Sequence, residues 1–195
     1  MPFPTSSTVD PGVAALHRTA ATAGFLAYAL MVGTVCWGVL TTTHLARRSV
    51  RRQTLYGGHM TMAVMTLSFL TIHIAGNLFN PLSPLGIANA VLPFFPGSTF
   101  GVSMGVVGAE LAACITISVW FQRRLGYRTW HRIHWLAYPA YMLSLAHTVV
   151  SGSDVRTELV ATALVASALC VTALFVFRAL PSTSLVRTTV APAEH

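Results

Sequence analysis

Residues 56–77 read YGGHMTMAVMTLSFLTIHIAGN, and residues 133–150 read IHWLAYPAYMLSLAHTVV. Neither segment contains Asp, Glu, Lys or Arg, and each is close to the roughly 20 residues that cross a hydrocarbon core as a helix. Each segment also carries two histidines, one towards either end. These two segments therefore predict an all-α protein in a membrane, with polar side chains placed inside two of its helices.

Three further segments have the same character, at residues 24–43, 102–122 and 159–177, and Glu110 is the only acidic residue within them. The chain as a whole is 54% hydrophobic and 9% charged, which excludes an ordinary soluble domain. We therefore predict an integral membrane bundle of about five transmembrane helices over residues 19–180. Residues 1–18 and 181–195 are predicted to be flexible tails. The proline-rich apolar loop 78–101 is expected to lie against the outer membrane surface or to cover the outer ends of the second and fourth helices.

Basic residues gather in alternate connections between the predicted helices. They are Arg47, Arg48, Arg51 and Arg52 after the first, Arg123, Arg124, Arg128 and Arg132 between the third and fourth, and Arg178 and Arg187 after the fifth. The positive-inside rule then predicts an outer N-terminus and a cytoplasmic C-terminus in a cell membrane. The net charge of +7 is explained by this topology and the lipid around it, so a nucleic-acid partner is not expected.

The intramembrane histidines fall at matched depths. His59 and His73 are 14 residues apart and His134 and His147 are 13 apart, or roughly 21 and 20 Å along a helix axis. One helix separates the two segments, so they run parallel to one another. His59 is therefore expected level with His134 on the inner side, and His73 level with His147 on the outer side.

Two imidazoles from facing helices are suited to hold haem iron from both axial sides. The spacing thus favours two haem b groups, or one if only one pair binds, over histidines that merely form hydrogen bonds within a bundle. A closed zinc site needs four ligands close together and fits poorly. Thirteen residues leave about 140° of mismatch between His134 and His147 in an ideal helix, and we expect Pro139 to distort the helix between them.

Residues 59–81, HMTMAVMTLSFLTIHIAGNLFNP, and 123–154, RRLGYRTWHRIHWLAYPAYMLSLAHTVVSGSD, resemble the ferric reductase-like transmembrane domain. Ferric reductases, NADPH oxidases and small bacterial haem proteins share this domain. The most specific features are the 14 and 13 spacings and the run Trp130, His134, Leu136, Tyr138, which is similar to the family's W-x-x-x-H-x-L-x-Y.

The resemblance implies that His59 and His134 ligate the iron of an inner haem, and His73 and His147 that of an outer haem. It also implies transmembrane electron transfer to an external acceptor such as ferric iron, oxygen or a partner oxidoreductase. Larger members have six helices and a flavin and nicotinamide domain, whereas only five helices are expected here. A separate reductase or quinol would then supply electrons to this membrane subunit of an oxidoreductase. The alternatives are a haem-binding sensor or assembly protein without turnover, and a cofactor-free membrane bundle.

Four other residues are accessory candidates, and no catalytic residue is predicted. Arg128 and Arg132 could pair with haem propionates, although topology alone also explains them. His131 could help to hold a propionate or face water. Glu110 could assist proton movement near the outer haem, or be neutral and hydrogen-bonded within the bundle.

Overall fold

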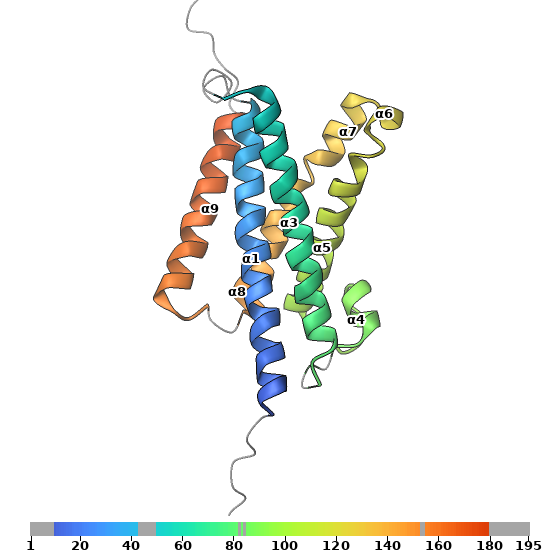
Figure 1. Ribbon diagram of the computed structural model, residues 1–195, viewed down its shortest axis with the longest axis vertical. Coiled ribbons are helices and arrows are strands. Elements are labelled where there is room, and N and C mark those ends of the chain that lie inside the picture. The colour runs from blue at the N-terminus through green and yellow to red at the C-terminus, as the bar shows by residue number, and fades with distance from the viewer. Residues whose placement is uncertain (1–9, 43–49, 82, 84, 153–154, 180–195) are drawn as a thin grey trace, which may run out of the picture.

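The computed structural model describes residues 10–42, 50–81, 83, 85–152 and 155–179, and its regular structure is helical throughout (Figure 1). The helices are α1 (Pro11–Thr42), α3 (Arg52–Leu78), α4 (Ile87–Val91), α5 (Phe100–Ser118), α6 (Gln122–Leu125), α7 (Tyr127–His134), α8 (Ala137–Ser151) and α9 (Glu158–Ala179). Helix α1 begins at Pro11, so residues 11–18 are helical although a flexible tail was expected there. The rest of that tail up to residue 9, and the C-terminal tail 181–195, lie outside the described residues.

Four helices, α1, α3, α5 and α9, are long and apolar enough to cross a membrane. The predicted all-α membrane bundle is confirmed in this form. The sequence predicted about five spans, but residues 133–150 are divided between α7 and α8 and do not form one long helix. Helix α8 has 15 residues, fewer than the roughly 20 that span a hydrocarbon core alone. Figure 1 shows α7 and α8 following one another from one end of the bundle towards the other.

The break between α7 and α8 follows from Pro139. Proline has no N–H, and within a helix its ring clashes with the carbonyl four residues earlier, here that of Trp135. Helix α7 ends at His134, and α8 begins at Ala137, so that Pro139 lies in its first turn, where no N–H is needed. The predicted distortion between His134 and His147 is therefore present, as a break between two helices rather than as a kink.

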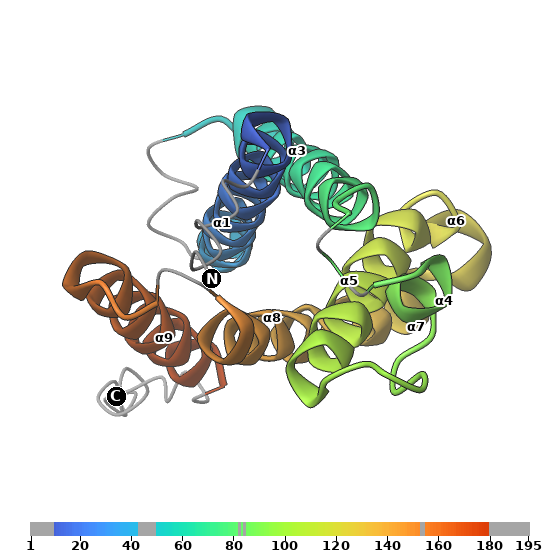
Figure 2. The same ribbon diagram turned by 90° about the horizontal axis from the view of Figure 1, so that it is seen from below.

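The bundle is built from two antiparallel helix pairs, α1 with α3 and α5 with α8 (Figure 2). Small residues let each pair approach closely. A Cβ at Gly76 of α3 would lie 2.8 Å from the Cβ of Ala20 in α1, and one at Gly108 of α5 would lie 3.0 Å from the hydroxyl of Ser144 in α8. The two pairs face each other, and side chains from α3 meet side chains from α7 and α8 between them.

Helix α9 lies beside α1 and α8 and is joined to them by a buried hydroxyl cluster. The hydroxyl of Tyr28 lies 2.6 Å from that of Ser167 and 3.4 Å from that of Tyr141, whose side chain is almost fully buried. The thiols of Cys36 and Cys170 also meet across α1 and α9, with 3.8 Å between their sulfur atoms. These contacts hold α9 against the two pairs.

Arginines gather at one end of the bundle, where α3 begins, α6 and α7 lie and α9 ends (Figure 1). We call this the basic end. It carries Arg51, Arg52, Arg123, Arg124, Arg128, Arg132 and Arg178. The opposite end holds α4 and the start of α1, while Arg47, Arg48 and Arg187 lie outside the described residues.

Candidate functional site

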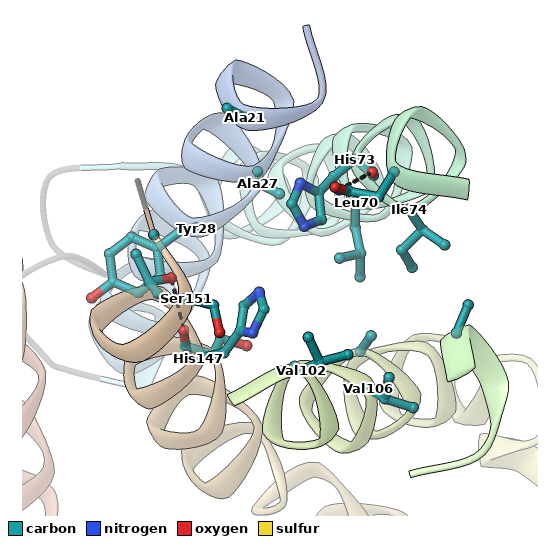
Figure 3. A pocket seen from close by; sticks show the side chains of 18 of the residues that line it. Ala21, Ala27, Tyr28, Leu70, His73, Ile74, Val102, Val106, His147 and Ser151 are labelled. Carbon is teal, nitrogen blue, oxygen red and sulfur yellow. Dashed lines mark hydrogen bonds between the residues drawn. The ribbon is translucent and has the colours of Figure 1, made fainter. Parts of the chain in front are cut away.

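Two cavities lie one above the other between the helix pairs, and each contains one of the predicted histidine pairs. The cavity lined by His59 and His134 lies towards the basic end and has a volume of about 420 Å³. The cavity lined by His73 and His147 has a volume of about 290 Å³. Figure 3 shows His73 and His147 reaching towards one another across the second cavity, with Leu70 on one wall and Val102 on the other.

The two rings of each pair stand at a separation that suits a shared metal ion. The ring centroids of His59 and His134 are 5.9 Å apart, and those of His73 and His147 are 6.2 Å apart. Metal–imidazole bonds are about 2 Å long, so two rings that bind one ion from opposite sides have centroids roughly 6 Å apart. The structure thus brings together both predicted pairs at the expected levels.

Three of these rings are oriented by a backbone carbonyl of the neighbouring helix. Nδ1 of His59 lies 3.1 Å from the carbonyl oxygen of Thr34. Nδ1 of His73 lies 2.8 Å from that of Ala20, and Nδ1 of His147 lies 2.8 Å from that of Gly101. A carbonyl only accepts, so Nδ1 carries the proton and donates. The other ring nitrogen, Nε2, then keeps its lone pair for a metal, as metal-binding histidines require.

Each of these carbonyls is followed four residues later by a glycine that makes room for the ring. A Cβ at Gly24 would lie 2.6 Å from Nδ1 of His73, one at Gly105 would lie 2.7 Å from Nδ1 of His147, and one at Gly38 would lie 3.1 Å from Cε1 of His59. These glycines were not predicted from the sequence. The signal was present, because Gly24 and Gly38 are spaced by 14 residues, as His59 and His73 are.

The cavities fit a large apolar cofactor held through iron. Both are lined mainly by apolar side chains, and neither has a carboxylate among its lining residues. Each supplies two imidazoles, the ligand set of a low-spin b-type haem. Met31 and Thr66 line both cavities, so they form part of the wall between them.

The structure places one of the four accessory candidates at a cavity and the other three outside both cavities. His131 lines the His59–His134 cavity, whereas Arg128, Arg132 and Glu110 are exposed and line neither cavity. The arginine that reaches the cavity is Arg178 at the end of α9, which the sequence had placed only by topology.

Arg178 ties α9 to the basic end of this cavity. Its Nη2 lies 3.3 Å from Nε2 of His131, and its guanidinium lies over the Trp135 ring at 5.2 Å. Its Nη1 lies 3.4 Å from the Thr42 hydroxyl. A cation is therefore fixed beside the histidine pair of the basic end, and the opposite cavity has no Arg or Lys among its lining residues.

His134 is held differently from the other three rings. It stacks on Trp130, with 5.1 Å between ring centroids and 26° between ring planes. Its Nδ1 and the Nε1 of Trp130 are both buried and have no hydrogen-bond partner in the described part of the chain.

The comparisons with known proteins agree with the resemblance seen in the sequence. A family model described as "Ferric reductase like transmembrane component" matches residues 23–145. The match covers well over half of the 195 residues and includes His59, His73 and His134, and it ends two residues before His147. No curated protein and no solved structure matches the chain.

Proposed function

Because the chain belongs to the ferric reductase-like transmembrane component family, we propose that it carries electrons across a membrane through two haem b groups, one in each cavity. The observation that carries the proposal is the placing of four imidazoles in two facing pairs within apolar cavities. Bound haem iron would supply one-electron chemistry between its ferrous and ferric states. The protein supplies ligands, orientation and a dry surrounding.

The roles of the side chains follow from their hydrogen bonds. His59, His73 and His147 donate from Nδ1 to a carbonyl, which fixes each ring and directs Nε2 into its cavity. His134, from α7, would be the second residue to hold the iron of the His59–His134 site. The histidines of α3 are 14 residues apart, so the two sites are separated by roughly 21 Å along the helix axis.

We further propose that the basic end faces the cytoplasm, because positively charged connections are retained on that side. Electrons would then enter at the His59–His134 site from a separate reductase or a quinol. They would leave from the His73–His147 site to an external acceptor such as ferric iron, oxygen or a partner oxidoreductase. The uncharged segment around α4, which contributes Leu85, Asn89 and Ala90 to the lining of the second cavity, lies at the exit.

Haem stoichiometry in the purified full-length protein tests the proposal. We expect about two b-type haems per chain by pyridine haemochrome, with the spectrum of a low-spin ferrous form after dithionite. A His59→Ala, His73→Ala double variant is the control and should retain neither. Protein produced with ample haem that contains none would overturn the proposal, and a haem protein that no reductase or quinol reduces would favour the sensor.

A further inference from the structure

The four proposed ligands are not equivalent, and the difference lies on the supporting helices α1 and α5. Three rings have the same support, a carbonyl for Nδ1 and a glycine four residues later: Thr34 and Gly38, Ala20 and Gly24, and Gly101 and Gly105. His134 has neither in the described structure, and its buried Nδ1 has no acceptor.

The register of α5 against α8 shows what stands in place of the missing glycine. Gly105 lies against His147, and Gly108 lies against Ser144, so a step forward on α5 matches an equal step back on α8. Extended by ten residues across the break before α8, this register would bring Ser118 level with His134. From this register we infer that the fourth supporting position is a serine.

Ser118 would remove the support through its side chain. In this register its side chain occupies the position that is glycine at the other three sites, and it is buried. Its hydroxyl donates to the Ile115 carbonyl at 2.6 Å, whereas the carbonyl that corresponds to the acceptors of the other three sites, four residues before Ser118, is that of Cys114. Helix α5 ends at Ser118, and the amide of the following Val119 turns back to the Thr116 and Ile117 carbonyls.

The position of His134 at the end of a helix also leaves its ring less restrained. It is the last residue of α7, directly before the break that precedes α8, whereas His59, His73 and His147 lie within helices. Its cavity is also the larger, at about 420 Å³ against about 290 Å³. A ring at a helix end, without a hydrogen bond from Nδ1, can swing away from a metal at lower cost than a ring fixed on both sides.

We propose that His134 is a replaceable ligand, so that the iron of the His59–His134 site exchanges this imidazole for a small neutral molecule while the other site stays closed. This inference rests on the proposed function, since it requires haem in both cavities. In the exchange the iron–nitrogen bond to His134 breaks and one bond from iron to the incoming molecule forms. No electron is transferred, and His59 remains bound on the opposite side.

Carbon monoxide is the probe, because it binds ferrous iron where an axial position opens. We expect the dithionite-reduced protein to bind about one carbon monoxide per two haems. His73→Ala, which lacks the other haem, should keep a carbon monoxide-reactive site with unchanged affinity, because His59 and His134 are intact. Two haems without carbon monoxide binding would overturn the proposal but not the electron-transfer function, whereas absence of haem would overturn both.

Ser118→Gly tests the cause. It removes the side chain at the position that is glycine at the other three sites, so the ring of His134 can approach the Cys114 carbonyl four residues earlier and should bind more firmly. The affinity for carbon monoxide should then fall roughly tenfold or more, the usual effect of a hydrogen-bond partner behind a metal ligand. Ser68→Gly is the matched control, because Ser68 is exposed on α3 and its hydroxyl bonds to the Val64 carbonyl of its own helix. Equal affinity in Ser118→Gly and wild type would overturn the assignment to Ser118.

The converse substitution, serine for glycine at the other site, is an independent test. Gly105→Ser places a side chain against Nδ1 of His147 and should make the second iron reactive towards carbon monoxide. If this variant does not accumulate, the result for Ser118→Gly still decides the question.

Discussion

The Nδ1 atom of His73 lies 2.8 Å from the carbonyl oxygen of Ala20, and its ring stands against Gly24, one helical turn further along α1. The same arrangement recurs at His59 with Thr34 and Gly38. Helix α1 contributes none of the proposed ligands, yet it orients both ligands of α3. A spacing of 14 residues returns to within about 40° of the same helix face, so one face of α1 serves both levels.

Gly24→Ala should disturb the His73–His147 site alone. The new Cβ would lie 2.6 Å from Nδ1 of His73, so the ring must move away from the Ala20 carbonyl. We expect about half of the haem to be lost or a tenfold or larger fall in haem affinity at that site, measured by haemochrome and titration. Gly57→Ala is the control, because nothing lies within 4 Å of a Cβ there. Equal haem content in the two variants would contradict the role assigned to Gly24.

His73→Ala should remove the haem of its own cavity and leave the spectrum of the His59–His134 site intact. The haem content per chain should fall by about half in the haemochrome assay. Unchanged haem content would show that His73 is not a ligand.

His131→Ala should keep both haems, although His131 is only three residues from His134. Its Nε2 faces Arg178 at 3.3 Å rather than the ring of His59. Absorption spectra of the reduced protein measure this, and loss of one haem would move the ligand assignment from His134 to His131.

Arg178→Gln should make the His59–His134 site harder to reduce. The guanidinium places a positive charge at this cavity, and a nearby cation disfavours the more positive ferric state. We expect the midpoint potential of this site to fall by roughly 30–60 mV, a three- to tenfold change in the one-electron equilibrium. Spectroelectrochemical titration measures it, and Arg128→Gln, an exposed arginine of α7, is the control. Equal shifts in the two variants would mean that the effect is not local.

Tyr28→Phe should loosen α9 without changing the ligands. The hydroxyl lost is the one that bonds to Ser167 at 2.6 Å and contacts Tyr141. A buried hydrogen bond between membrane helices contributes about 1 kcal/mol to stability, so the unfolding midpoint in detergent should fall measurably. Tyr56→Phe, on an exposed tyrosine, should leave the midpoint unchanged.

The proposed orientation can be read from cysteine labelling in a background without the native cysteines. Phe94→Cys, in the segment after α4, should react with a membrane-impermeant maleimide on intact cells, because Phe94 is 64% exposed and lies at the end of the bundle opposite the basic end. Arg124→Cys, at the basic end, should react only after the cells are opened. The opposite pattern would reverse the direction of electron transfer that we propose.

The sequence predicted the helices and the histidine levels well, because both depend on periodicity and length along a single helix. It also located the irregularity at Pro139, although it could not show that α7 would end and α8 begin around it. The number of spans was overestimated by one, because hydropathy measures apolar composition and not helix continuity.

The supporting elements were not predictable in the same way. The carbonyls of Ala20, Thr34 and Gly101 belong to the backbone and have no signature in residue type. Arg178 reaches the cavity from α9 only through tertiary packing, whereas Arg128 and Arg132, much closer to His134 in sequence, are exposed and do not line it. Sequence proximity was a poor guide to which cation lies at the site.

Met31 and Thr66 belong to the walls of both cavities, and neither side chain carries a charge. For the proposed function this partition acts as a dielectric spacer. An electron can tunnel through such a layer, whereas a proton or a hydrated ion would need a chain of polar groups to follow it. Each electron would therefore cross without a proton or ion to balance its charge. The transfer would itself contribute to the electrical potential across the membrane.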